Sequence, residues 1–128
     1  MTLARVILGL GALAFAGIGI GFLVVPVRWA AVVDIVLPTA TARTDLRATY
    51  GGFDLAIGVL LACCALRADW LRPGLVAFGL AAAGFGGGRL IGILVERTAS
   101  RLMLGFLTIE IASVLVAAYA LRRLPPLP

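Results

Sequence analysis

Five side chains that could do chemistry stand inside otherwise apolar stretches of this sequence. Arg47, Tyr50 and Asp54 have the i, i+3, i+7 spacing that places side chains on one face of a helix. Arg89 and Glu110 each lie within a later apolar stretch. Charges inside membrane-spanning helices are costly, so they usually face other protein groups, where they pair or bind a ligand. The sequence therefore predicts a polar site built from these five residues.

The positions of three of these charges along their helices support this prediction. At 1.5 Å per residue, Asp54 lies roughly 12 Å into the second predicted span. Arg89 lies a similar distance from the end of the third span, and Glu110 a similar distance from the start of the fourth. Because successive spans alternate in direction, all three charges should lie at similar depth, with Arg47 and Tyr50 nearer the surface. Arg89 could then pair with either acid, and Arg47 could balance the remaining negative charge.

The composition is that of a membrane protein. Of 128 residues, 62% are hydrophobic and 13% are charged, whereas soluble domains are about half apolar and about one quarter charged. A helix needs about 20 apolar residues to cross the hydrocarbon core. We predict an all-α integral membrane four-helix bundle, a single domain over residues 1–128, with spans at about 6–25, 46–66, 74–96 and 102–121. Thr44 is the expected N-cap of the second span, and Gly17 with Gly21 has the spacing of close helix contacts.

The charged residues exclude several function classes. The net charge is +5, and all eleven basic residues are arginines that mostly flank the apolar runs, as in membrane proteins, so we expect no nucleic acid partner. The chain has no histidine, which removes histidine-liganded zinc, histidine-ligated haem and a Ser-His-Asp triad. We expect neither a metal nor a cofactor.

Three segments carry a resemblance to a known family: RATYGGFDLAIGVLL, GGGRLIGILVE and TIEIASVL. With them the chain resembles a family of small bacterial four-helix integral membrane proteins catalogued as a domain of unknown function. The distinctive positions are Arg47, Tyr50, Gly51, Gly52, Gly88 and Arg89. The resemblance covers nearly the whole chain; it implies the four-helix bundle and supplies no activity. We expect a multi-pass protein of the bacterial inner (plasma) membrane, and the arginine distribution favours cytoplasmic termini.

Several hypotheses for function stay open at this point. The first is binding of a hydrophobic small molecule or lipid, with or without acid–base catalysis by the carboxyl groups. The second is a structural or accessory subunit that packs against a larger membrane complex or a second copy through its glycine-rich faces. The third is a proton- or ion-coupled carrier. In a fourth, the charges form only a buried ion-pair network that fixes helix register.

Overall fold

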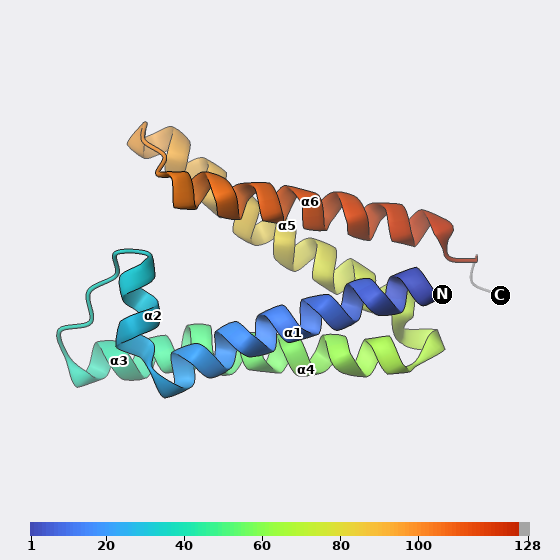
Figure 1. Ribbon diagram of the computed structural model, residues 1–128, viewed down its shortest axis with the longest axis horizontal. Coiled ribbons are helices and arrows are strands. Elements are labelled where there is room, and N and C mark those ends of the chain that lie inside the picture. Colours follow the sequence, from blue (N-terminus) through green and yellow to red (C-terminus); the bar gives the residue numbers. More distant parts are fainter. Residues whose placement is uncertain (126–128) are drawn as a thin grey trace. The chain divides into compact units, whose positions relative to one another are not determined.

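The computed structural model describes residues 1–125, which form helices and connections without a β-strand (Figure 1). The elements are α1 (Thr2–Val24), α2 (Pro26–Val32), α3 (Ala40–Leu46), the π-helix η1 (Arg47–Gly52), α4 (Phe53–Leu66), the 3-10 helix η2 (Ala68–Trp70), α5 (Leu71–Glu96) and α6 (Arg101–Arg123). Four helical stretches among them are long and apolar enough to cross a membrane: Thr2–Val24, Ala40–Leu66, Ala68–Glu96 and Arg101–Arg123. The predicted all-α membrane fold class is therefore confirmed.

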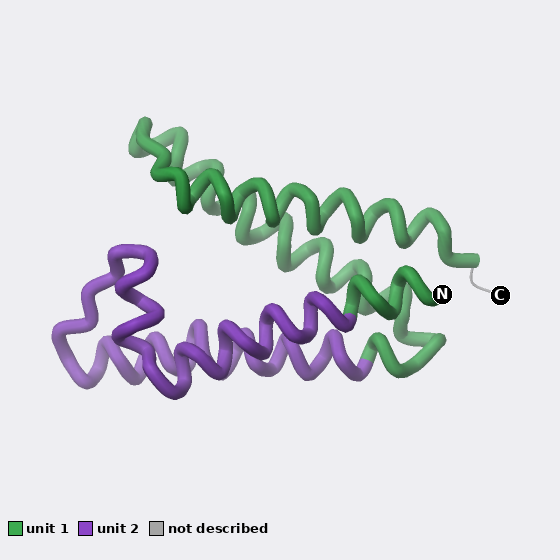
Figure 2. Tube along the Cα trace, viewed as in Figure 1, with its two compact units in different colours: residues 1–8, 64–128 green, residues 9–63 purple. Residues whose placement is uncertain are grey.

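The chain divides into two compact units (Figure 2). Unit 2 is Gly9–Cys63, which contains most of α1, all of α2, α3 and η1, and most of α4. Unit 1 contains the first eight residues and the chain from Cys64 onward, with η2, α5 and α6. The prediction that residues 1–128 act as one domain stays a prediction.

In unit 2, the ends of the helices follow from local sequence. Val25 leaves the helical conformation (φ −130°, ψ 61°), because a residue before proline avoids the α region. Pro26 then occupies the first turn of α2, where a proline needs no amide hydrogen. The N-cap of the next helix is Thr39, whose hydroxyl accepts a hydrogen bond from the Ala42 amide (3.1 Å). The expectation for Thr44 was wrong: the helix begins a turn earlier, at the first threonine after the proline.

Close contact between α1 and the η1–α4 helix depends on glycines. A Cβ added to Gly19 would lie 2.5 Å from the Leu55 amide nitrogen and 2.8 Å from the Gly51 carbonyl oxygen. A Cβ on Gly58 would lie 2.7 Å from the Ala16 nitrogen. The two helices therefore touch backbone to backbone, which only small residues permit.

The predicted Gly17–Gly21 pair does not act as a pair. An added Cβ on Gly17 meets no atom within 4 Å beyond its own helix backbone, whereas one on Gly21 would collide with the Trp29 indole of α2. Gly19, between them, makes the contact with the η1–α4 helix, because the helix presents that face to its neighbour.

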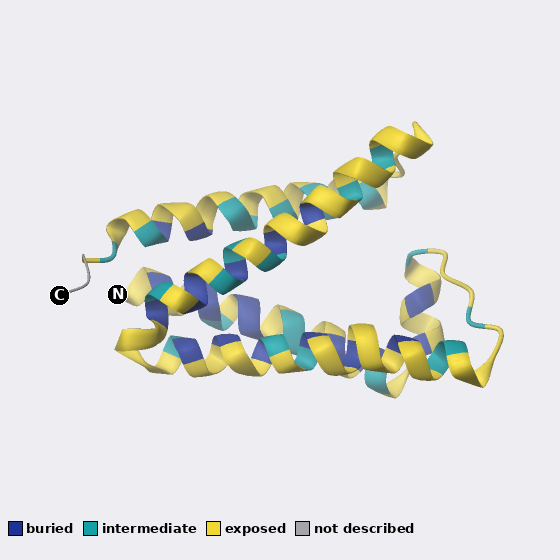
Figure 3. Ribbon diagram, turned by 180° about the vertical axis from the view of Figure 1, so that it is seen from behind, coloured by how far each residue is buried: buried dark blue, intermediate teal, exposed yellow. Residues whose placement is uncertain are grey.

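Unit 1 is a helical hairpin of α5 and α6, which lie side by side (Figure 1). Its turn is short because Arg97, directly after the end of α5, is in a left-handed conformation (φ 51°). Ser100 then caps α6, its hydroxyl accepting a hydrogen bond from the Met103 amide (3.2 Å). The buried residues of α5 recur every three or four positions along one face: Leu71, Gly74, Leu75, Phe78, Ala82 and Gly86. Most of α6, by contrast, is exposed (Figure 3).

Candidate functional site

The five predicted site residues lie in both units. Arg47, Tyr50 and Asp54 belong to unit 2, on η1 and the first turn of α4. Arg89 and Glu110 belong to unit 1, on α5 and α6. Within each unit the predicted residues have defined neighbours. The convergence of all five on one site stays a prediction.

Arg89 and Glu110 form an ion pair across the α5–α6 hairpin. The Arg89 Nη2 donates to Glu110 Oε1 at 2.7 Å, and its Nε lies 3.1 Å and 3.0 Å from the two carboxylate oxygens. Charged hydrogen bonds of this fork geometry are roughly twice as strong as neutral ones. The pair is mostly covered, with side-chain exposures of 22% and 13%. The predicted pairing of Arg89 with an acid at its own depth is present, and the two charges neutralise each other.

Two other side chains of the hairpin contact the Arg89 guanidinium group. Its Nη1 lies 3.1 Å from the Met103 sulfur, and its central carbon lies 5.0 Å from the centre of the Phe106 ring. A guanidinium over an aromatic face gains cation–π energy that grows as water is removed. Gly86 leaves room for the Glu110 side chain, because an added Cβ there would stand 3.2 Å from the Glu110 Cβ and 3.6 Å from its Oε2. Arg89 is thus held from three sides within its own hairpin.

Arg47 contacts the end of α1 rather than an acid of unit 2. Its Nε donates to the Leu23 carbonyl oxygen at 3.0 Å. Leu23 lies in the last turn of α1, where carbonyl groups lack helical partners and the helix dipole is negative. An arginine is the favoured charge at that position. Arg47 therefore satisfies the C-terminus of α1, a role that the sequence argument missed because it considered only side-chain charges.

Tyr50 joins a small aromatic group at the same end of α1. Its ring centre lies 5.1 Å from that of Phe22, and Phe22 lies 5.8 Å from Trp29 with the planes tilted by 53°. Such tilted pairs each contribute about 0.5–1.5 kcal/mol beyond burial. The Tyr50 side chain packs η1 against Phe22 of α1, and Phe22 in turn contacts Trp29 of α2. This packing accounts for the position of Tyr50.

Asp54 is the buried acid of unit 2. It is 4% exposed, on the first turn of α4, and it makes no hydrogen bond or ion pair with any residue of Gly9–Cys63. Gly51 and Gly58, one helical turn before and after it, both contact α1. Asp54 thus directly precedes Leu55, whose backbone nitrogen lies at the close contact with Gly19. No fully buried side-chain nitrogen or oxygen of the described residues lacks a hydrogen-bond partner, so the Asp54 carboxyl oxygens keep some surface exposure although the residue as a whole is buried.

The π-helix η1 was not expected from the sequence. It covers Arg47–Gly52, and the Phe53 amide bonds to the Ala48 carbonyl, five residues back. Short π segments inside α-helices are frequent at functional sites. Here the segment carries Arg47 and Tyr50 and ends just before Asp54. The paired glycines Gly51 and Gly52 are the only residue-type signal for it, and they are consistent with a continuous α-helix as well.

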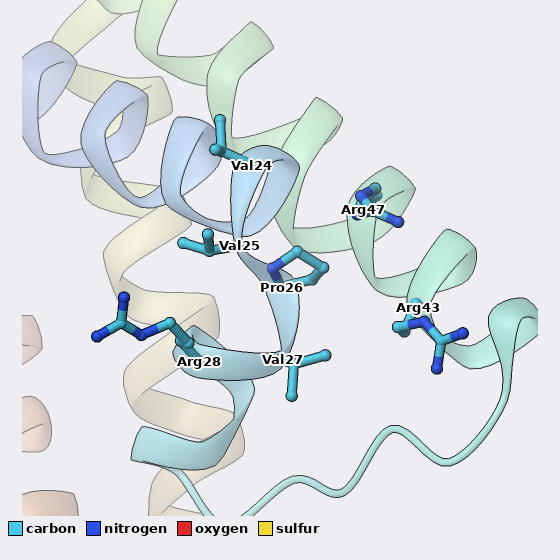
Figure 4. Close-up of a pocket in the computed structure, with 7 residues that line it drawn as sticks. All are labelled: Val24, Val25, Pro26, Val27, Arg28, Arg43 and Arg47. Carbon is cyan, nitrogen blue, oxygen red and sulfur yellow. The ribbon is translucent and has the colours of Figure 1, made fainter.

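An open pocket of about 250 Å³ in unit 2 was also missed (Figure 4). It lies where α1 gives way to α2, next to α3 and η1. Its lining combines four apolar residues with three arginines: Val24, Val25, Pro26, Val27, Arg28, Arg43 and Arg47. The sequence indicated this pocket only through the arginines of the connection after the first span. The sequence analysis used those arginines only to predict the topology.

Among the described residues, no group of three or more histidine, cysteine, aspartate or glutamate side chains could hold a metal ion. Within the described spans, the polar groups that stand out are the closed Arg89–Glu110 ion pair, the buried Asp54 and the pocket with three arginines in its lining; a second ion pair, Arg67–Asp69, is exposed between two spans.

The four apolar helices define the class as a multi-span helical membrane protein. Residues 3–121 match the model of one family, described as Domain of unknown function (DUF4345), and the chain belongs to that family. The predicted membership in a family of unknown function is confirmed. No curated protein and no solved structure matches the chain.

Proposed function

We propose that this membrane protein binds a hydrophobic small molecule or lipid, and that the Asp54 carboxyl group is its polar contact. The observation that carries the proposal is Asp54 itself, an acid of only 4% exposure that makes no hydrogen bond or ion pair within its unit. A ligand hydroxyl or amine would donate a hydrogen bond to this carboxyl group.

The surroundings of Asp54 favour a mostly apolar ligand. It is the only charged residue in Phe53–Leu66, whose other members are apolar or glycine. Binding sites for small molecules are commonly apolar with a few placed polar groups. An anionic group on the ligand would be repelled by an ionised carboxylate, so we expect a neutral or cationic donor at this position.

The other four candidate residues receive structural roles in this proposal. Arg89 and Glu110 satisfy each other and hold α5 against α6, as in the ion-pair network hypothesis. Arg47 and Tyr50 fasten the end of α1 to η1. They support the Asp54 region by keeping these helices in place.

The test is native mass spectrometry of the protein extracted with its own lipid by a polymer. Wild type is compared with Asp54→Asn and with the matched control Asp45→Asn, an exposed acid on α3. We expect a discrete small molecule on wild type and on the control, and its loss from Asp54→Asn with the helical content unchanged. An equal amount of the molecule on Asp54→Asn, or none on wild type, would refute the proposal.

A role as an accessory subunit is the second candidate, and the outer surface of the hairpin favours it. Four glycines of α5 face open space, since an added Cβ meets no described atom within 4 Å beyond the local helix backbone: Gly84, Gly87, Gly88 and Gly92. Large apolar side chains of α6, such as Ile109 and Leu115, are more than 60% exposed. A stoichiometric protein partner in the same experiment, without a small molecule, would support this candidate instead.

A further inference from the structure

We propose that the arginine-lined pocket between the end of α1 and the start of α3 binds the phosphate headgroup of an anionic phospholipid. The proposal does not rest on the role of Asp54. It concerns a separate place in unit 2, lined by Val24, Val25, Pro26, Val27, Arg28, Arg43 and Arg47.

The charge of the pocket is uncompensated. Its lining contains three arginines and no acid. Unit 2 has three acidic residues, Asp34, Asp45 and Asp54, and none of them forms an ion pair with an arginine. Arginines 43 and 47 do donate to backbone carbonyls, at 3.4 Å and 3.0 Å, but a carbonyl leaves the net charge in place. An anion is the complementary occupant, and guanidinium groups favour phosphate.

The position of the pocket along the spanning helices places it at the level of the membrane surface. It lies at the end of one spanning helix, α1, and at the beginning of another, Ala40–Leu66. Trp29, next to Arg28, is 38% exposed, and tryptophan is enriched at the level of the lipid headgroups. The phosphates of a bilayer lie at this level.

The shape of the pocket distinguishes a lipid from a free ion. Its volume of about 250 Å³ is open, and it is smaller than the roughly 300–1,000 Å³ of sites that enclose a whole small molecule. Arg28 points to one side of Val25 and Pro26, while Arg43 and Arg47 stand on the other (Figure 4). The guanidinium groups thus flank an apolar floor instead of converging on one point. A headgroup spread over the opening, with its acyl chains along the exposed valines, fits this arrangement better than a compact inorganic anion.

The experiment measures lipid affinity on delipidated, detergent-solubilised full-length protein by native mass spectrometry. Phosphatidylglycerol, which is anionic, is compared with phosphatidylcholine, which carries a phosphate but no net charge. The variant is Arg28→Gln with Arg43→Gln, and Arg47 is kept because it bonds to the end of α1. The matched control is Arg5→Gln with Arg122→Gln, two exposed arginines outside the pocket.

We expect phosphatidylglycerol to bind wild type more tightly than phosphatidylcholine does. The pocket variant should lose about 30-fold in phosphatidylglycerol affinity, the effect of two arginines near an anionic surface, and the control should lose less than about threefold. If the double variant unfolds, Arg28→Gln alone should lose about fivefold, since its side chain makes no hydrogen bond or ion pair within unit 2.

Three results would overturn the proposal. The first is equal phosphatidylglycerol affinity for wild type and the pocket variant. The second is an equal loss in the control, which would mean a general charge effect. The third comes from calorimetric titration with inorganic phosphate alone: binding as tight as that of the lipid would identify a free-anion site.

Discussion

Replacing Gly19 by alanine should weaken the packing of α1 against the η1–α4 helix. The new methyl group would stand 2.5 Å from the Leu55 nitrogen and 2.8 Å from the Gly51 oxygen, both backbone atoms. Because backbone atoms of a packed helix cannot rotate aside, the helices must separate. Overpacking of this kind costs about 1–3 kcal/mol, and the better helix propensity of alanine returns up to about 1 kcal/mol. We expect a net loss of about 1–2 kcal/mol.

Gly17→Ala is the matched control for this prediction. It makes the same chemical change on the same helix, two residues earlier, where an added Cβ meets no atom within 4 Å. Only the propensity gain should remain, so this variant should be as stable as wild type or slightly more so. Reversible unfolding of each variant in mixed detergent and SDS micelles, followed by circular dichroism, measures the difference. Free energies of unfolding that agree within about 0.5 kcal/mol would refute the backbone-contact argument, because that agreement lies within ordinary surface effects.

Two further predictions concern unit 1. Arg89→Met and Glu110→Met should each lower the free energy of unfolding by about 3 kcal/mol, the cost of one unpaired charge in a spanning helix. The double variant leaves no charge unpaired, so its loss of stability should be smaller than the sum of the two single losses. A coupling energy below about 0.5 kcal/mol in this double-mutant cycle would contradict the ion-pair argument. The arginine distribution predicts that the α5–α6 turn faces away from the cytoplasm. The test is Thr98→Cys in a variant that lacks Cys63 and Cys64, and this single cysteine should react with an impermeant maleimide added to intact cells. Labelling only after lysis would show the opposite topology.

The spans could be predicted from the sequence because length and apolarity alone determine them. The Arg89–Glu110 pair could also be predicted. The two residues lie at similar distances along their helices from the turn that joins those helices, so both charges lie at the same depth. The observed bond of 2.7 Å agrees with that argument. One-dimensional spacing is informative when two helices are joined by a short turn, because the turn fixes their register.

The features that escaped prediction depend on which face of a helix packs. Gly17 and Gly21 have the expected spacing, yet Gly19 makes the contact with the η1–α4 helix. The π-helix shifts hydrogen bonds by one residue without a distinctive residue type. Arg47 bonds to a backbone carbonyl, and carbonyl groups at helix ends are the same in every sequence. Charges inside apolar runs are visible in a sequence, whereas the partners offered by the backbone depend on tertiary structure.

The ion pair of the hairpin also has a consequence for synthesis of the chain. Twenty-one residues separate Arg89 from Glu110, and ribosomes add about 5–20 residues per second. Arg89 therefore leaves the ribosome roughly one to four seconds before its partner. During that interval α5 carries an unneutralised charge, which raises the cost of entering lipid by itself. The two helices are best suited to enter the bilayer together, as one neutral hairpin, once Glu110 has emerged.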